Sequence, residues 1–407
     1  MMLKKLKRIL FFIVLPVFVL WVASSLFSYF THSVVPEIRL VGLQKDGYYA
    51  KKLSCNIKSD NSYKIAKLNI FLDGKKIELR NDQVVRTKKF NIPFKFDISG
   101  VSNGKHILEI EAVDGSYNRN KSVEKWPFYV DNISVKAVFL QQEYKVDQGR
   151  TIHVRIQANK QLEKIHVKFL EDTYNCYPES NYSNVYECFI PIECEQNSGE
   201  YMMESYLKDF VKNIKNDVTL LSKVVVNTVK FPKQHGFKIP EGKLEEEKEI
   251  SMSDKILEEA LEKWVKDSPK KKLWRGHFEI PINMKRIATP FGEIRTTPEK
   301  GRYLHRAVDI LDSPKSVVWA SQDGKVIIRD RFLKSGNTVV LDHGLGVFTL
   351  YFHLDDFSNV EVGDFIKKGN PIGKLGMTGY ATGYHLHWEL RVKNVPVDPF
   401  QWIKKSF

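Results

Sequence analysis

A long run of residues without a charged side chain lies near the amino terminus, and it constrains this chain more than any other feature. The run extends from Ile9 to Phe30. As a helix with a rise of about 1.5 Å per residue it would be roughly 33 Å long, close to the hydrocarbon thickness of a bilayer. The four basic residues of the chain's start, Lys4, Lys5, Lys7 and Arg8, precede it. Basic residues before an apolar run place the amino terminus in the cytoplasm and the rest of the chain outside.

A cleaved signal peptide is the alternative interpretation of the same segment. Its small-residue cleavage site would be Ala23-Ser24-Ser25. The apolar run continues past that site to Phe30, which favours an uncleaved anchor. Either interpretation exports the body of the protein. We therefore expect a single-pass protein of the cytoplasmic membrane, with its carboxy-terminal domains outside the cytoplasm and no nucleic-acid partner.

The net charge agrees with a location beside an anionic surface. Lys and Arg number 63 against 49 Asp and Glu, which gives +14. The excess is spread along the chain rather than gathered in one arm. A diffuse positive charge suits a membrane surface or a carboxylate-rich polymer as neighbour.

Two segments of short alternating strands follow the apolar run. In the first, Ala66, Leu68, Ile70 and Leu72 alternate with other residues up to the turn signal Asp73-Gly74. Strands at this spacing predict an antiparallel β-sandwich over 36–131, and a similar pattern predicts a second over 132–227. In strand rhythm the pair resembles the immunoglobulin-like modules of bacterial surface proteins. We expect spacer or interaction modules without chemistry of their own, which leaves room for a protein partner.

The second segment also contains isolated histidines and most of the cysteines. His153 and His166 fall on the polar faces of their strands, so we expect solvated surface side chains. Cys176, Cys188 and Cys194 lie close in sequence but lack the paired spacing of a structural zinc site. One bridge, Cys176–Cys188 or Cys188–Cys194, and free buried thiols remain as alternatives.

Residues 228–275 are predicted to be a linker with one amphipathic helix. Ser251 and Asp254 suggest the start of the helix. Apolar residues then recur at helical spacing: Ile256, Leu257, Ala260, Leu261, Trp264 and Val265. Such a stripe most often docks on its own protein.

Histidines concentrate in the carboxy-terminal part of the chain, at 305, 343, 353, 385 and 387. His305 and Asp309 are four residues apart. His385 and His387 are two apart in a β-prone run, which puts both on one face of a strand. Two histidines and a carboxylate around an open position form a common catalytic zinc set.

The order of these motifs resembles that of the lysostaphin/LytM-type zinc endopeptidases, which cut peptide cross-bridges in bacterial cell walls. The resemblance covers roughly residues 275–402. It rests on His-x-x-x-Asp at 305–309, Tyr-x-His-Leu at 351–354 and Gly-x-His-Leu-His-x-Glu at 383–389. Further matching segments are 288–292 with Arg295, 320–326, 336–344, 362–364, 368–373 and 378–379.

The resemblance implies a role for each residue that matches the motifs. His305, Asp309 and His387 match the ligands of one Zn²⁺ per catalytic domain. His353 and His385 match the two catalytic histidines that flank the metal-bound water, and the sequence leaves open which of them is the general base. His343 matches a position outside the metal set, with a structural role.

One position departs from the family pattern. The family usually has Gly where this chain has Ala307, and Ala disfavours positive φ. We therefore expect a slightly shifted loop between His305 and Asp309.

Together these features predict a mainly β, multidomain protein. Its segments are a basic end and anchor (1–35), two immunoglobulin-like β-sandwiches (36–131 and 132–227), a linker (228–275) and a LytM-type antiparallel β catalytic domain (276–407). The predicted function is zinc-dependent hydrolysis of peptidoglycan peptide cross-links, with stem peptides as substrate. The alternative is a catalytically silent wall-binding or amidase-activating protein of the same fold. The isolated fragment 275–407 is expected to bind zinc on its own.

Overall fold

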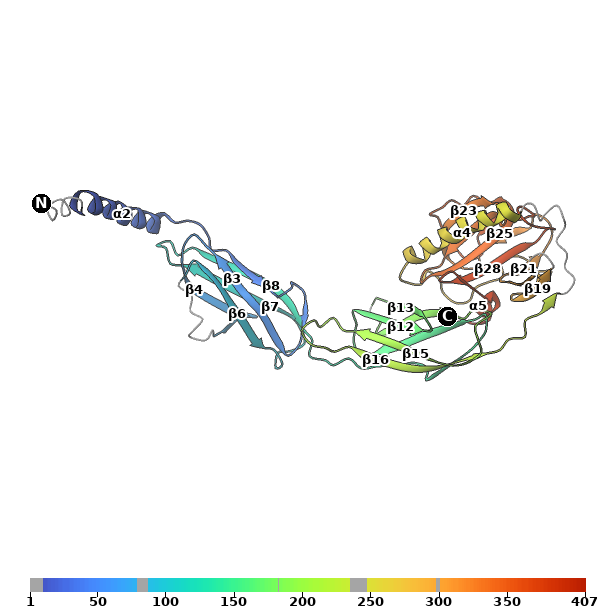
Figure 1. The fold of residues 1–407 in the computed structure, drawn as a ribbon, viewed down its shortest axis with the longest axis horizontal. Helices are drawn as coiled ribbons and strands as arrows, with labels where there is room; N and C mark the ends of the chain where they lie inside the picture. The colour runs from blue at the N-terminus through green and yellow to red at the C-terminus, as the bar shows by residue number, and fades with distance from the viewer. Residues whose placement is uncertain (1–9, 79–86, 182, 235–246, 298–300) are drawn as a thin grey trace. The chain divides into compact units, whose positions relative to one another are not determined.

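The chain is mainly β, and it divides into two compact units. The computed structural model describes residues 10–407 except 79–86, 182, 235–246 and 298–300. One unit comprises residues 1–134 and 209–216, and the other residues 135–208 and 217–407. Figure 1 shows the elements of both along the chain.

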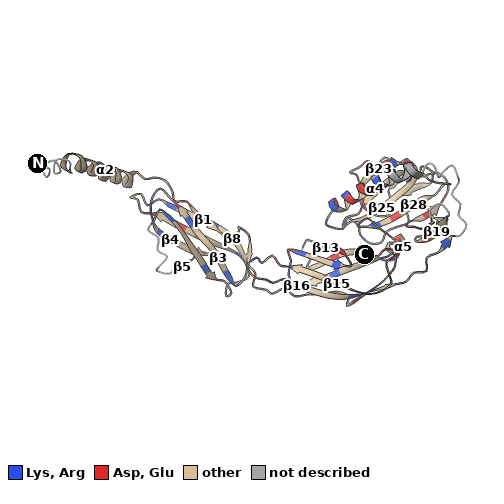
Figure 2. Ribbon diagram, viewed as in Figure 1, with Lys and Arg blue, Asp and Glu red and all other residues tan. Residues whose placement is uncertain are grey.

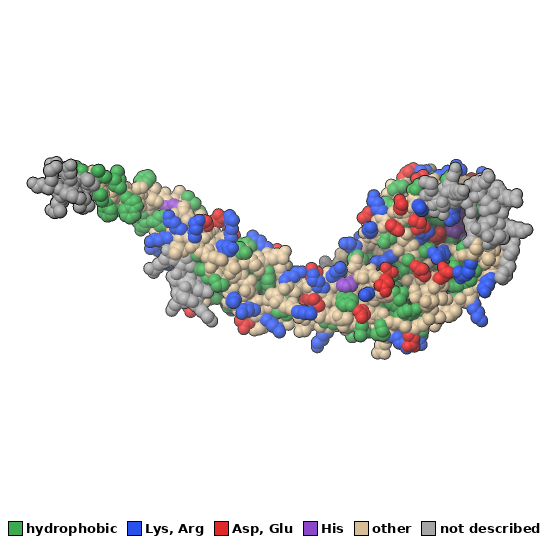
Figure 3. Space-filling model, viewed as in Figure 1, with side chains coloured by type: hydrophobic (Ala, Val, Ile, Leu, Met, Phe, Trp, Pro, Cys, Tyr) green, Lys and Arg blue, Asp and Glu red, His purple; other side chains and the backbone are tan. Residues whose placement is uncertain are grey.

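The predicted apolar helix is present. A short π-helical turn, η1 (Leu10–Val14), leads into α2 (Leu15–Thr31). The segment Phe11–Thr31 has a mean hydropathy of 2.3, and none of it is buried in the protein. Figure 3 shows hydrophobic side chains covering the described part of this helix. By length and composition it suits a membrane span, and a signal sequence would meet the same criteria. The predicted basic end, Lys4 to Arg8, lies outside the described residues.

Two sheets of the first unit share one buried cluster. The first sheet has the order β1 (Ile38–Val41), β3 (Lys52–Asp60), β6 (Lys89–Asp97). The second has the order β2 (Tyr48–Tyr49), β8 (Lys121–Val130), β7 (Gly104–Asp114), β4 (Ile65–Leu72), β5 (Lys75–Ile77). Buried side chains from both sheets, such as Ile57 and Ile110, belong to the same core.

The hairpin predicted at Asp73-Gly74 is confirmed, but the predicted face of Ala66 is wrong. Leu72 pairs with Lys75, and the two turn residues have φ values of 50° and 78°. Ile65 is buried and Ala66 is exposed, because a register shift between Ile65 and Lys67 interrupts the alternation. A bulge reverses which residues face the core on its two sides.

The strands of the predicted second sandwich form one continuous eight-stranded sheet. Its order is β10 (Glu143–Asp147), β16 (Val218–Asn227), β15 (Gly199–Lys208), β12 (Lys164–Phe169), β13 (Asp172–Pro178), β14 (Val185–Pro191), β11 (Thr151–Ala158), β9 (Ala137–Phe139). β13 pairs with β12 and with β14, and therefore joins the two halves of the sheet. Residues from both halves, such as Val167 and Val154, share one buried cluster.

Cys176 and Cys188 lie side by side within this cluster. Their Sγ atoms are 3.1 Å apart, and both thiols are free. Cys194 packs in a different cluster, with residues of the carboxy-terminal sheet. Of the two bridges that the sequence leaves open, only Cys176–Cys188 has its sulfur atoms in contact here.

The carboxy-terminal part contains a ten-stranded sheet, a small sheet and two helices. The main path of the large sheet is β18 (Arg286–Thr289), β21 (Val308–Leu311), β28 (Leu386–Val392), β25 (Val347–Phe357), β24 (Gly336–Asp342), β23 (Gly324–Phe332), β26 (Phe365–Ile366). β22 (Val317–Trp319), β27 (Pro371–Leu375) and β29 (Val395–Val397) pair beside that path. The small sheet joins β17 (Lys233–Gln234), β19 (Glu293–Thr297) and β20 (Gly301–His305). The helices are α4 (Glu247–Asp267) and α5 (Pro399–Lys404).

The linker helix docks on its own protein, as predicted. Leu257 and Leu261 of α4 are buried against Phe348 and Leu350 of β25, and Figure 1 shows the helix lying along this sheet. The predicted start at Ser251 is wrong, because the helix already includes Glu247.

The eight-stranded sheet, from here on the middle sheet, packs against the carboxy-terminal part. Phe189 of β14 is buried in a cluster with Trp274, Trp402 and Phe407. The His153 ring stacks on Phe189, with 4.7 Å between the centroids, and its Nε2 lies 2.7 Å from a Glu187 carboxylate oxygen. His153 is therefore not a solvated surface residue, because the carboxy-terminal part covers this face of the sheet. The domain boundaries predicted from the sequence remain predictions.

Candidate metal centre

The pairing of three strands brings the predicted site residues together. β28 lies between β21 and β25, and its register puts His387 opposite Asp309 on one side and opposite Phe352 on the other. His305 is the last residue of β20, and His353 directly follows Phe352 on β25. The Phe352 ring stacks on the His387 imidazole, with 5.1 Å between the ring centroids.

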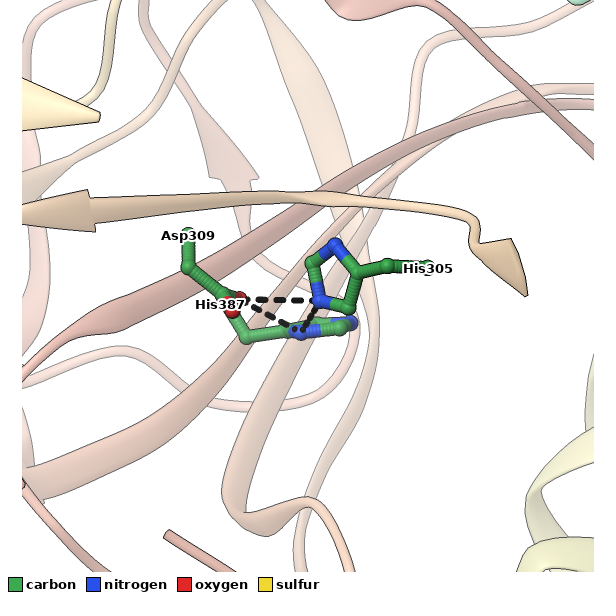
Figure 4. Close-up of side chains that lie close together, drawn as sticks. All are labelled: His305, Asp309 and His387. Carbon is green, nitrogen blue, oxygen red and sulfur yellow. Dashed lines mark hydrogen bonds and ion pairs between the residues drawn. The ribbon is translucent and has the colours of Figure 1, made fainter. Parts of the chain in front are cut away.

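Three side-chain atoms converge as ligands of one metal ion would. His305 Nε2 lies 3.3 Å from His387 Nδ1 and 3.2 Å from Asp309 Oδ1, and His387 Nδ1 lies 2.9 Å from the same oxygen. Figure 4 shows the three side chains pointing toward one another. Ligand atoms of a tetrahedral zinc site, with bonds of about 2.0–2.1 Å, lie about 3.3 Å apart. The residues present therefore fit a zinc ion.

The charges of this group favour a cation. Burial raises the pKa of Asp309, but hydrogen bonds with His305 and His387 outweigh burial and hold that pKa well below its usual range. Burial lowers the pKa of His305, which favours the neutral imidazole that a metal requires. Burial lowers the pKa of His387, but its contacts with Asp309 and Glu389 outweigh burial and raise that pKa to about 9. The proton between His387 Nδ1 and Asp309 is therefore one that a metal ion would displace.

His353 and His385 lie beside the three ligand atoms, and a backbone carbonyl oxygen holds the ring of each at Nδ1. His353 Nδ1 is 2.8 Å from the carbonyl oxygen of Thr378, and His385 Nδ1 is 2.9 Å from that of Gly383. Each Nδ1–H therefore donates to a backbone carbonyl, which leaves Nε2 as the reactive nitrogen. The two ring centroids are 4.8 Å apart, and His385 Nε2 is 3.8 Å from Asp309 Oδ1.

The backbone of His353 is strained. Its φ is 60°, a region that residues other than Gly seldom adopt. A close crossing of two glycine segments supports it: a Cβ on Gly336 would lie 2.4 Å from the carbonyl oxygen of Thr378, and one on Gly379 would lie 2.4 Å from the nitrogen of Gly336. Such strain persists where the surroundings fix it, and it concentrates at functional sites.

Ala307 and His343, the other two residues that the sequence analysis names in this region, are both buried and lie outside the ligand group. Ala307 is fully buried and does not adopt positive φ, so alanine fits this position without backbone strain; the expected shift of the loop stays a prediction. His343 is fully buried, with Nδ1 2.7 Å from the carbonyl oxygen of Asp323 and Nε2 2.7 Å from the Thr349 hydroxyl. Both ring nitrogens are therefore occupied, which agrees with a structural role.

The sequence motif at 383–389 includes Glu389 without giving it a role, and sequence reasoning missed the two charged residues that continue from it, Arg391 and Glu258. Glu389 and Arg391 are buried on β28, and Glu258 of α4 contacts Arg391. The signal was the alternation of polar residues at 385, 387, 389 and 391 with apolar ones, which puts four polar side chains on one face of a strand.

Comparison with known proteins identifies this part of the chain. Residues 303–399 match the model of Peptidase family M23 and form a domain of that family. Over 127 residues the chain is 39% identical to the DD-carboxypeptidase/endopeptidase Mpg of Neisseria meningitidis serogroup B, covering 31% of this chain and 29% of that protein. Over 129 residues it is 36% identical to the peptidoglycan DD-endopeptidase ShyB of Vibrio cholerae, covering 31% of this chain and 30% of that protein. The chain thus spans less than a third of the curated relatives that it matches.

A solved structure is similar over a longer stretch. The putative peptidase M23 from Pseudomonas aeruginosa aligns with 66% of this chain and 92% of its own, at 21% identity and a TM-score of 0.43.

Proposed function

We propose that this protein is a zinc-dependent endopeptidase that hydrolyses peptide cross-links of bacterial peptidoglycan. The convergence of His305, Asp309 and His387, with His353 and His385 beside them, is the observation that carries the proposal. The family of residues 303–399 and the names of the relatives support the same reaction and substrate.

The histidines outside the ligand group would move the protons of the reaction. A bound zinc ion would supply Lewis acidity and lower the pKa of the attacking water. Burial and the neighbouring imidazoles of His387 and His385 lower the pKa of His353 to about 3, so its Nε2 carries a lone pair at neutral pH. One of His353 and His385 would take the proton of the water and return it to the leaving amine. The other, protonated on Nε2 as well as Nδ1, would donate a hydrogen bond to the oxygen of the scissile carbonyl.

The rival proposal, a silent wall-binding or activating protein, is less well supported because the ligand set is complete. The test is the zinc content of the purified, detergent-solubilised chain and the release of new amines from isolated cell walls. We expect one zinc per chain and amine release that a chelator abolishes. A chain that binds no zinc and releases no amine would favour the rival.

The names of the relatives also suggest the class of bond. Because ShyA, ShyB and ShyC of Vibrio cholerae are named peptidoglycan DD-endopeptidases, we propose a DD cross-link between stem peptides. Mass spectrometry of a digested cross-linked muropeptide dimer, with a pentaglycine-bridged dimer as control, would test this. Cleavage of the pentaglycine bridge alone would contradict it.

We propose that α2 anchors the protein in the cytoplasmic membrane and that the catalytic domain works outside the cytoplasm. Residues 36–131 would be an immunoglobulin-like spacer, and residues 132–227 a second such module that supports the catalytic domain. Membrane fractionation of the tagged chain, with protease added from outside the cytoplasm, tests the location. A soluble product that begins after Ser25 would show that the helix is a cleaved signal.

A further inference from the structure

A series of contacts between charged side chains connects Nε2 of His387, the nitrogen that faces away from His305 and Asp309, with helix α4. From these contacts we infer that Glu258 of α4 is a positioning residue for His387, acting through Arg391 and Glu389. Glu258 lies outside residues 303–399, the part that matches the peptidase family. The inference rests on the proposed function only in that His387 holds a metal ion.

The contacts are short and continuous. His387 Nε2 lies 3.1 Å from Glu389 Oε1, and Arg391 Nε donates to Glu389 Oε2 over 2.6 Å. Arg391 Nη1 donates to both carboxylate oxygens of Glu258, each over 2.8 Å. Asn394 completes the end of the series: its Oδ1 accepts from Arg391 Nη1 over 2.9 Å, and its Nδ2 donates to Glu258 over 3.1 Å.

Packing fixes the position of Glu258. Its neighbours in the helix, Leu257 and Leu261, are 5% and 0% exposed and pack on the side chains of β25. Glu258 itself has 45% of its side chain exposed, whereas the Arg391 side chain is only 8% exposed. The carboxylate therefore closes the solvent end of a network whose other end is the metal ligand. Figure 2 shows acidic and basic residues along α4 where it lies on this sheet.

The network orients His387 and places a net negative charge beside it. The Glu389 carboxylate accepts from Nε2–H, so Nδ1 is the nitrogen left for a metal ion, and Nδ1 is the atom that faces His305 and Asp309. Glu389 and Arg391 alone would be neutral together, whereas Glu258 gives the network one net negative charge. A negative charge behind a ligating imidazole strengthens its hold on a cation.

His305, the other imidazole of the group, lacks such support. Its Nδ1 is buried and has no hydrogen-bond partner among the described residues. Of the two imidazoles in the group, that of His387 is therefore the one held through the nitrogen that faces away from the other donors.

The test compares two charge-neutralising variants of one helix in the detergent-solubilised full chain. Glu258→Gln removes the charge from the network, and Glu259→Gln removes the same charge from the neighbouring exposed position. Zinc affinity is measured by chelator competition, the cobalt-substituted protein by its absorption spectrum, and the metal-free protein by its melting temperature. Groups that hold a ligand from behind contribute about 10- to 100-fold to metal affinity, and Glu258 is further removed. We expect Glu258→Gln to weaken zinc binding about 3- to 10-fold and to alter the cobalt spectrum, and Glu259→Gln to do neither.

Equal zinc affinities and cobalt spectra for the two variants would overturn the inference, and so would a lower metal-free melting temperature with parental zinc affinity. If Glu258→Gln does not fold, Arg391→Lys provides the second test, because a lysine ammonium keeps the charge but cannot bridge both carboxylates. Parental affinity and spectrum in a folded Arg391→Lys protein would again overturn it. A parent that binds zinc but releases no amine from cell walls would contradict the proposed function and leave this inference standing.

Discussion

Phe189 links the middle sheet to the carboxy-terminal part, and its replacement by alanine gives a quantitative test of that link. The residue is 1% exposed, and its ring lies 5.6 Å from Trp274, 5.3 Å from Trp402 and 5.8 Å from Phe407 between centroids. Removal of a buried phenylalanine side chain costs about 3 to 5 kcal/mol. In a unit of this size, about 1 kcal/mol lowers the melting temperature by roughly 2 to 3 °C. We therefore expect Phe189→Ala to lower the transition of the second unit by roughly 6 to 15 °C.

The assay is scanning calorimetry of the detergent-solubilised chain, with Phe365→Ala as the matched control. Phe365 has the same ring but is 48% exposed on β26, so its loss should change the stability by less than about 0.5 kcal/mol. If both variants melt within about 2 °C of each other, the packing described here does not hold the second unit together.

The same packing changes what we expect of an isolated carboxy-terminal fragment. The sequence predicts that residues 275–407 bind zinc alone. The structure shows that such a fragment would lose Phe189, and with it the cover of Trp402 and Phe407. It would also lose α4 and therefore Glu258. We now expect the fragment to aggregate or to bind zinc more weakly than the full chain.

Three further predictions test other parts of the structure. His387→Ala should lose zinc, whereas His353→Ala should keep its zinc and its melting temperature yet lose about 10² to 10⁴ in turnover, measured as zinc content and amine release from cell walls. In an oxidising compartment Cys176 and Cys188 should form a disulfide, so that thiol labelling of the unreduced, denatured protein finds two thiols and not four. Burial raises the pKa of Asp342 to about 6, above about 3.9 in the unfolded chain, so the folded protein binds more protons and its stability falls as pH rises from about 4 to 6. Asp342→Asn should flatten that part of the stability curve in urea titrations at several pH values.

The sequence predicts the residues of the candidate site better than their surroundings, because the site residues come in pairs that are close in sequence. The spacing of His305 and Asp309, and of His385 and His387, places each pair within one short segment, so few long-range facts are needed. The roles of these residues came from the family resemblance, since spacing alone did not assign them.

The features that the sequence does not predict depend on contacts between residues that are far apart in the chain. The exposed Ala66 results from a register shift against β7, and the cover on His153 comes from residues more than a hundred positions away. The contact of Glu258 with Arg391 spans 133 residues. An amphipathic stripe predicts that a helix docks, but it does not predict which charged residue on the edge of the stripe meets a partner.

The charged network behind His387 is costly for a purely structural feature. Glu389 and Arg391 are each about 6% exposed, on a strand whose alternate residues are apolar. The free energy lost when two charges are removed from water often exceeds their coulombic attraction. Proteins with well-packed apolar residues at such positions are therefore often as stable or more stable. Stability alone therefore gives no reason for this pair, or for the carboxylate that α4 brings to it. The network ends on Nε2 of His387, a candidate metal ligand, where it would orient the imidazole and strengthen its binding of a cation. On this reasoning, a variant with apolar residues at 258, 389 and 391 should fold at least as stably as the parent but bind zinc more weakly, by calorimetry and chelator competition. A stable triple variant with parental zinc affinity would show that the charges serve neither purpose.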